Sequence, residues 1–394
     1  MRKSLSRDPT QLRKALLGCL LVICFEGLQG NYNLVLTHCL SGVQLLQHWL
    51  LDQKEKSYGS DEDTIEDEKR KMEGIVSPNR YIIEDELVQA FGRLDLQVMA
   101  YIDPRPTSTH ESLMKEGEVT VRFMPDVFLT VDTARLYWEV VQRRSSHFIA
   151  SAAAKKREGG RYVPTTKVDL GGGEEIMNFH PESEIYGADS EMGLPRDYQK
   201  CAAEISRWFD AFFPFYNELD KDMDDRTYIA SSLLLIHAKT SEIMLLSSLF
   251  GDESSLDRFL PEYKEVVALA SEVTRSKFFK PSKYKFDLGI VNPLRMVAKW
   301  CREPRTRREA IGLLRESGVR EGIYDGLIMA RTQEYIMELE EEGMDENGQI
   351  PEDMRWRYRG VKLDCVRRIA EVEAERLGRG PDGERVVRGT NISW

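Results

Sequence analysis

Apolar residues near the start of the chain recur at steps of four and three positions, the spacing of one helix face. Four residues share that face: Leu12, Leu16, Cys19 and Ile23. The tripeptide Gln-Gly-Asn at 29–31 interrupts the pattern, because Gly and Asn tolerate the left-handed backbone that ends a helix. A second helical pattern then runs to residue 51. Helices joined by so short a turn pack antiparallel, so the sequence predicts a helical hairpin over 1–52.

The same helical spacing continues through most of the remaining chain, whereas strand-like alternation is scarce. Helices are expected at 82–100, 127–154, 198–219, 228–250, 292–302, 306–316, 319–342 and 351–377. Pro214 should kink or end its helix, and Pro351 suits a first helical turn. Thr306 with Glu309 matches a capping box. We therefore expect an all-α fold, with antiparallel helical hairpins packed into a large irregular helical bundle with long disordered loops.

Changes in composition divide the chain into six segments. They are the hairpin at 1–52, a charged linker at 53–77, a helical segment at 78–154, a Gly- and Pro-rich loop at 155–193, the main helical body at 194–378 and a tail at 379–394. The linker has almost no apolar content and so cannot bury a core. The loop holds two glycine runs without helical spacing, which is typical of flexible connections.

The charge of the chain limits what it can bind. Its 394 residues carry a formal net charge of −11, and the sequence pI is about 5.3. Domains that bind nucleic acid normally carry a basic excess, because they displace counterions from the phosphates. We therefore expect no DNA-binding residues in this chain, and a function on DNA would need another segment for the contact.

The six cysteines do not match a metal site. They are Cys19, Cys24, Cys39, Cys201, Cys301 and Cys365. A binuclear zinc cluster also needs six cysteines, but in closely spaced CxxC pairs, and no such pair occurs in the sequence. We expect no metal ligands, and we interpret these cysteines as small reduced core residues of an intracellular protein.

Catalytic motifs are missing from the sequence as well. The six histidines are His38, His48, His110, His147, His180 and His237. No HExxH and no other ligand spacing links them, and there is no GxSxG elbow or GK[ST] phosphate loop. We expect no catalytic residues and no enzymatic activity, with His237 as a hydrogen-bonded core histidine.

Two charged clusters in the second half of the chain are expected to be solvated. The basic one comprises Lys299, Arg302, Arg305, Arg307 and Arg308. It could bind an anion or direct nuclear import, but interspersed acidic residues favour a solvated helix junction. The acidic run 338–342 is interpreted as a solvated helix end.

The amino terminus leaves a secretory alternative open. Basic residues precede an apolar run from Ala15 to Phe25, as they do in a signal peptide. Glu26 follows the run at once, and no small-residue cleavage pair comes after it. The run is also shorter than the ~20 residues that span a bilayer. We therefore favour an intracellular protein without a membrane segment.

Two widely separated segments carry family-like motifs. The first, 15–46, is an apolar helix, a turn and a second helix, and its motif residues are Glu26, Gln29, Gly30, His38 and Gly42. The second, 286–325, has a Gly-Ile-x-x-Pro-Leu helix, a Cys-Arg-x-Pro turn, an Arg-Arg-x-Ala-Ile helix and an Arg-Glu-Gly segment ending in Tyr-Asp. Its motif residues are Gly289, Pro293, Leu294, Cys301, Arg302, Pro304, Arg307, Arg308, Arg320, Glu321, Gly322 and Asp325.

Together the two segments resemble the regulatory (fungal-specific transcription factor) domain of fungal Zn₂Cys₆ zinc-cluster transcription factors. The resemblance implies a nuclear regulator of RNA polymerase II transcription, of a metabolic pathway or a secondary-metabolite biosynthetic gene cluster. It implies protein partners in the transcription machinery or among co-regulators, and a homodimer. Zinc is expected only in an upstream cluster that this sequence does not show, so we expect no cofactor here. The alternative is a cytosolic helical scaffold without a function on DNA.

Overall fold

The computed structural model describes residues 9–57, 72, 74–99, 103, 105–158, 175–177, 195–222, 225–248, 252–280, 284–364 and 367–394. These residues are mostly helical, which confirms the expected helical class, although a small sheet is also present. Most of the expected linker and most of the expected Gly- and Pro-rich loop lie outside the described residues. The chain divides into two compact units, Met1–Ser151 with Pro195–Leu219 and Ala152–Leu194 with Asp220–Trp394.

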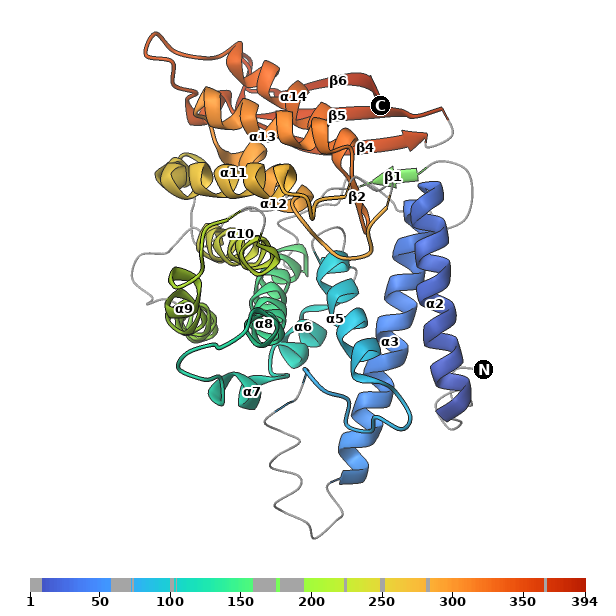
Figure 1. Ribbon diagram of the computed structural model, residues 1–394. Helices are drawn as coiled ribbons and strands as arrows, with labels where there is room; N and C mark the ends of the chain where they lie inside the picture. The colour runs from blue at the N-terminus through green and yellow to red at the C-terminus, as the bar shows by residue number, and fades with distance from the viewer. Residues whose placement is uncertain are drawn as a thin grey trace. The chain divides into compact units, whose positions relative to one another are not determined.

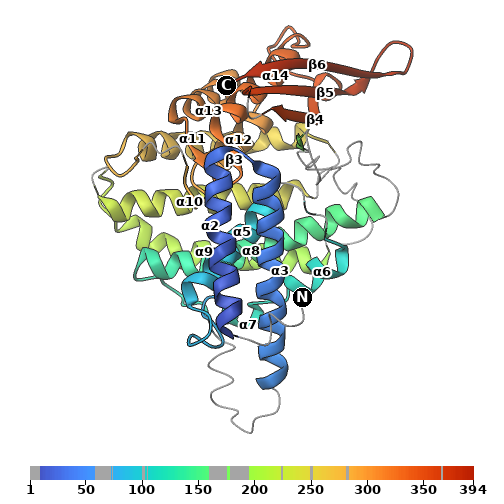
Figure 2. The ribbon, with the colours of Figure 1, turned by 90° about the vertical axis from the view of Figure 1, so that its right-hand side faces the viewer.

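The first unit is built from helices. Their bounds are α2 (Pro9–Gln29), α3 (Tyr32–Ser57), α5 (Asp85–Met99), α6 (Thr107–Leu113), α7 (Glu118–Arg122), α8 (Val131–Glu158) and α9 (Arg196–Asn217). Figures 1 and 2 show α2 and α3 side by side and antiparallel, which confirms the predicted hairpin. Helix α3 extends to Ser57, into the segment expected to be a linker. Helix α9 belongs to this unit, although the composition placed it with the body at 194–378.

Aromatic rings fill the core between α8 and α9. Trp138 and Trp208 lie with ring centroids 4.9 Å apart, and Trp208 stacks on Phe212 at 4.5 Å. The Trp208 indole N–H donates to the Ala134 carbonyl at 2.9 Å, so its polar atom is satisfied inside the core. Pro214 does not stop α9, which continues to Asn217 because the proline sits in its last turn.

The second unit contains the remaining helices and a sheet. Its helices and short strands are α10 (Arg226–Ser247), η1 (Ser254–Phe259), α11 (Leu260–Arg275), α12 (Val291–Trp300), α13 (Pro304–Ser317), β2 (Arg320–Glu321), β3 (Tyr324–Asp325) and α14 (Gly326–Glu341). The helices expected at 228–250, 292–302 and 306–316 are confirmed within a few residues. The helix expected at 319–342 begins only at Gly326, because the β2–β3 hairpin precedes it.

The prediction of a helix at 351–377 is wrong. An antiparallel sheet in the order β1-β4-β5-β6 takes its place, with η2 (Glu352–Met354) before it and β6 in the expected tail. The strands are β1 (Glu175–Met177), β4 (Trp356–Asp364), β5 (Ile369–Arg379) and β6 (Arg385–Ser393). Buried Ala370, Val372 and Ala374 alternate with exposed glutamates along β5, which is the period of a strand. The helix-favouring Ala and Glu residues concealed that alternation.

One face of this sheet packs on α14. Ile336 and Leu339 of α14 form a buried apolar cluster with Trp356 of β4 and Ala374 of β5. This contact is the tertiary reason for the strands, because a sheet with one apolar face needs a helix to cover it.

Helix α10 is the one described helix that is long and apolar enough to cross a membrane by length and composition. Within its most apolar window, 61% of the helix is buried inside the protein, as expected for a core helix.

The cap of α13 differs from the predicted capping box. Thr306 lies inside the helix, and the cap is Glu303, whose carboxylate accepts the backbone N–H groups of Arg305 and Thr306 at 3.3 and 2.7 Å. Pro304 follows at the first helical position, where its missing N–H costs nothing. Asp225 caps α10, where its side chain accepts the backbone N–H groups of Thr227 and Tyr228.

Candidate functional site

The first family-like motif forms the turn of the α2–α3 hairpin. Glu26 accepts hydrogen bonds from Asn31 through both its carboxylate, at 2.5 Å, and its backbone carbonyl, at 2.9 Å. Gly30 has a φ of 84°, a left-handed conformation that favours glycine. Gln29 is exposed at the end of α2, and His38 is half-buried on α3. Glu26 and Gly30 therefore close the helical hairpin.

Gly42, the last residue of this motif, allows α3 to approach α5. A Cβ atom at this position would collide with the Phe91 ring. We predict that Gly42→Ala lowers the free energy of unfolding by about 1–3 kcal/mol, because the ring must leave its packed rotamer. Urea denaturation followed by circular dichroism measures the change.

Gly18 of α2 is the matched control for this prediction. Nothing lies within 4 Å of a Cβ atom built there, so Gly18→Ala should gain up to about 1 kcal/mol from helix propensity. Equal effects of the two substitutions would contradict the close approach at Gly42.

The second motif forms the caps of two helices. Glu321 of β2 accepts the backbone N–H groups of Gly289, Ile290 and Val291 at 2.8, 3.2 and 2.9 Å, so its carboxylate closes the amino end of α12. Burial raises the pKa of Glu321, and the three backbone N–H donors oppose that rise. A Cβ atom at Gly289 would collide with the same carboxylate, so the glycine is needed for the cap.

Asp325 performs the corresponding role for α14. Its carboxylate accepts the backbone N–H groups of Leu327 and Ile328 at 2.9 and 3.3 Å, and its other oxygen pairs with Arg320 at 2.7 Å. Gly322, with a φ of 55°, forms the turn between the two short strands. The Arg-Glu-Gly segment is therefore a small hairpin that caps two helices from one place.

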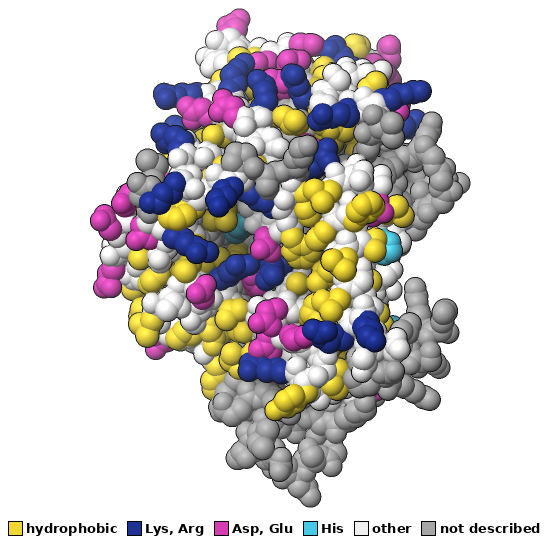
Figure 3. Space-filling view, turned by 45° about the vertical axis from the view of Figure 1, so that its right-hand side comes forward, with side chains coloured by type: hydrophobic (Ala, Val, Ile, Leu, Met, Phe, Trp, Pro, Cys, Tyr) yellow, Lys and Arg dark blue, Asp and Glu magenta, His cyan; other side chains and the backbone are white. Residues whose placement is uncertain are grey.

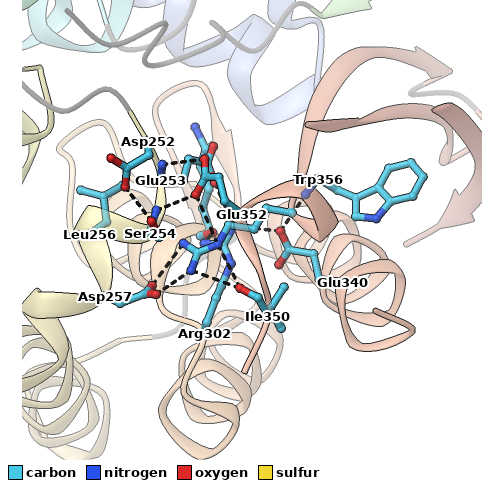
Figure 4. A network of polar contacts seen from close by, with 12 residues as sticks. Asp252, Glu253, Ser254, Leu256, Asp257, Arg302, Glu340, Ile350, Glu352 and Trp356 are labelled. Atoms are coloured by element: carbon cyan, nitrogen blue, oxygen red, sulfur yellow. Dashed lines mark hydrogen bonds and ion pairs between the residues drawn. The ribbon is translucent and has the colours of Figure 1, made fainter. Parts of the chain in front are cut away.

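Two further motif residues, Arg302 and Arg307, meet at a buried carboxylate, Glu340 of α14. One Glu340 oxygen accepts from Arg302 at 2.8 Å and from the Trp356 backbone N–H at 2.9 Å. The other oxygen accepts from Arg307 at 2.6 Å. Arg302 also binds Glu253 at 2.9 Å. Figure 4 shows Arg302 with Glu340 and Glu253, residues contributed by separate parts of the second unit.

The expected solvation of this region is therefore wrong for four charged residues, since Lys299 is buried together with Arg302, Arg307 and Glu340. Arg307 is 1% exposed, Glu340 is 0% exposed, and Arg302 is also buried, whereas Arg305 and Arg308 are exposed as predicted. The tertiary contacts explain the difference, because two arginines and two glutamates balance their charges inside one network. Burial raises the pKa of Glu340, but the Arg302 and Arg307 guanidinium groups outweigh this and hold it below its usual value.

A second ion pair extends the network toward η1. Buried Arg355 pairs with Asp257 at 2.5 Å. Glu352 accepts the backbone N–H groups of Glu253 and Ser254 at 2.9 and 2.8 Å. Figure 4 shows Glu352 beside Glu253 and Ser254. The whole arrangement fixes η1 to the segment before the sheet, which is a structural role.

A separate buried cluster in the first unit was missed from the sequence. His110 of α6 and His147 of α8 contact each other through their Nδ1 atoms at 3.1 Å. His147 Nε2 lies 3.1 Å from the Asp95 carboxylate, and Arg105 lies between Asp95, at 2.7 Å, and Asp103, at 2.9 Å. All five side chains are buried. They come from segments far apart in the chain, so no spacing pattern signals them.

The donors in this cluster follow from the charge on Asp95. Burial disfavours its ionisation, but Arg105 and His147 hold the pKa of the carboxyl well below its usual range. His147 Nε2 therefore donates to the ionised Asp95 carboxylate, and a single proton is shared between the Nδ1 atoms of His147 and His110. His110 Nε2 lies 3.7 Å from the Asp103 carboxylate. Burial lowers the pKa of His110 to about 4, although Asp103 opposes that shift.

A histidine that hydrogen-bonds a carboxylate is a familiar catalytic arrangement, but access decides whether it can act. Both rings here are 0% exposed. The arrangement holds α6 to α5 and α8 through the contact between the two rings and the contact of His147 with Asp95. Among the described residues, no group of His, Cys, Asp and Glu side chains could hold a metal ion.

The cysteines within the described residues are free thiols. Burial raises the pKa of Cys39 and of Cys201 to about 12, which makes both unreactive at neutral pH. Cys365 lies outside the described residues.

Comparison with known proteins finds no matching family model, no matching curated protein and no matching solved structure. The motifs in the sequence and the contacts of their residues are therefore the observations on which a function can be argued.

Proposed function

We propose that this chain is the helical regulatory and protein-interaction body of a nuclear transcription regulator of the zinc-cluster type. It would act on RNA polymerase II transcription of a metabolic pathway or a secondary-metabolite biosynthetic gene cluster. The observation that supports this is the use of the second motif: Glu321 and Asp325 cap helices, and Arg302 and Arg307 share the buried Glu340. If the resemblance of this segment to the family were accidental, its charged residues would not be expected to cap helices and to share a buried carboxylate.

The charge of the chain sets how such a regulator would reach DNA. A net charge of −11 opposes direct binding to phosphates, so DNA contact belongs to another module or to a partner protein. The chain itself would contact co-regulators or the transcription machinery, without a cofactor and without enzymatic activity.

Chromatin immunoprecipitation of the tagged native protein tests this proposal. We expect enrichment at a limited set of promoters. The buried Arg302→Ala variant should lose that enrichment, because it leaves Glu340 and Glu253 short of a charge partner. Arg305→Ala is the matched control, since this neighbouring arginine is exposed and its removal should leave enrichment unchanged.

The exposed apolar residues of the hairpin favour a second candidate, a cytosolic scaffold. Leu21, Phe25 and Leu51 are each at least half exposed, as expected for a surface that binds proteins. Fluorescence microscopy and immunoprecipitation together separate the two candidates. A protein confined to the cytosol, with no promoter enrichment, would favour the scaffold and exclude the transcription regulator.

A further inference from the structure

Strand β6 forms one edge of the sheet. It pairs with β5 on one side, and among the described residues no strand pairs with its other side. Figures 1 and 2 show β6 as the last strand, beyond β4 and β5. Within the part of the chain that the structure describes, the backbone N–H and C=O groups on that outer side therefore have no partner strand. Of the groups that a protein offers, only another extended backbone matches their spacing along the whole strand.

β6 lacks the features that normally keep an edge strand from pairing. Proteins protect such edges with proline, with bulges or with charged side chains. Residues 387–393 contain no proline, and their register with β5 runs without a shift. Arg388 is the one charged residue among them, and it pairs with Glu342 at 2.6 Å and lies over the Trp356 ring. The edge from 389 to 393 is therefore regular and neutral, as an added strand requires.

The side of β6 that faces α14 is only half covered. Thr390 and Ile392 lie directly opposite Val372 and Ala370 of β5, so the four side chains share one face of the sheet. The two β5 residues are 0% exposed, whereas the two β6 residues are half-buried. Neighbouring strands cover each other's side chains on a shared face. A further strand with apolar residues on this face would complete the cover.

The opposite face of the sheet favours a positively charged partner. Glu371 and Glu373 of β5 are 54% and 51% exposed. The cations that pair with them, Lys362 at 3.7 Å and Arg359 at 4.0 Å, both lie on the β4 side. Figure 3 shows side chains of both charges at the top of the view, where Figure 1 places α13 and the sheet. On the β6 side, the residues opposite these two glutamates are neutral.

Gly389 gives a cation from a further strand access to Glu373. The two residues lie opposite each other in the ladder. Glycine contributes no side chain between Glu373 and the next strand position. Because neighbouring strands are ~4.8 Å apart, a Lys or Arg side chain on the added strand is long enough to reach across Gly389 to the carboxylate.

We propose that an extended segment of a partner protein adds to the outer edge of β6 as a further strand, with apolar side chains on the α14 side and a Lys or Arg opposite Gly389. Backbone hydrogen bonds supply the affinity of such a contact, and the alternating side chains supply its specificity. The proposal does not rest on the function proposed above, because it names only the form and the charge of the partner segment.

A synthetic peptide tests this interface on the purified full chain. The probe alternates valine and lysine over about nine residues, the length of β6, so that one side is apolar and the other is positively charged. We expect fluorescence anisotropy to show binding of the labelled peptide. Hydrogen exchange of the β6 amides should slow by at least about 10-fold when the peptide is bound. The same peptide N-methylated at every residue keeps its charge but has no backbone donors, so it should not protect β6.

A double variant locates the peptide on β6. Gly389→Lys with Asn391→Lys places positive charges where the cation of the partner should lie, so the affinity for the peptide should fall by at least about 10-fold. Val127→Lys with Leu129→Lys is the matched control, because it adds the same charge at exposed residues of the first unit and should leave binding unchanged. Unchanged circular dichroism would show that both double variants fold.

Three results would overturn the proposal. They are unchanged exchange of β6 at millimolar peptide, equal protection by the N-methylated peptide, and unchanged affinity of the Gly389→Lys, Asn391→Lys variant. Protection of β6 that rises with protein concentration in the absence of peptide would show pairing with a second copy, and would overturn it too. Chromatin immunoprecipitation is independent of these outcomes.

Discussion

Replacing Glu340 with alanine is expected to unfold the second unit. The substitution leaves Arg307 buried beside Arg302 without the carboxylate that both of them bind. Burial already lowers the pKa of Arg307, and Glu340 is the partner that opposes this shift. Removing one partner of a buried ion pair typically costs about 3–5 kcal/mol, which is a large part of the stability of one domain. Urea denaturation followed by circular dichroism measures the loss.

Two variants serve as controls for this result. Glu341→Ala changes the adjacent residue, whose partner Arg308 is half-exposed, and should cost less than about 1 kcal/mol. The triple variant Glu340→Leu, Arg302→Met, Arg307→Met removes the charges together and should recover most of the stability, because no buried charge is left unpaired. A Glu340→Ala protein as stable as Glu341→Ala would show that the network is not buried in solution.

Acidification from pH 6.5 to pH 4 is expected to destabilise the first unit. The pKa of His110 is about 4 in the folded protein and near 6.5 in the unfolded chain, so the unfolded chain binds the proton more readily between these values. The free energy of unfolding should therefore fall as the pH falls through this window, by about 2–3 kcal/mol. Above pH 6.5 the contribution of His110 is complete and the dependence should be flat.

Hydrogen exchange of the backbone amides around His110 and in α8, measured between pH 6.5 and pH 4, reports the change in stability of the first unit. His110→Asn keeps a donor toward His147 but cannot titrate, so its stability should vary much less with pH. His48→Asn, at an exposed histidine of α3, should keep the original dependence. Identical pH profiles for the native protein and His110→Asn would assign the acid sensitivity to other groups.

The helical framework could largely be predicted from the sequence. The hairpin of α2 and α3 followed from apolar spacing and the Gln-Gly-Asn break, both of which are local properties. The sheet could not be predicted in the same way. Strand β5 has both a period-two pattern and helix-favouring residues, and only the apolar face of α14 decides between them.

For the motif residues, too, only part could be predicted from the sequence. The sequence identified the segments in which they lie, but not the contact that each residue makes. Glu321 caps a helix that begins thirty residues earlier, and the sequence contains no local signal for such a cap. The histidine cluster had no signal at all, because Asp95, His110 and His147 come from three separate helices.

The sequence alone determined the helical class, the opening hairpin and the acidic balance of the chain, because each is a local or additive property of the residues. Only the tertiary structure decided which charges are buried. Arg302 and Arg305 look alike in the sequence, yet the first is buried with Glu340 and the second is exposed. The physical reason is that burial of a charge depends on a partner brought from a distant segment, which no short stretch of sequence specifies.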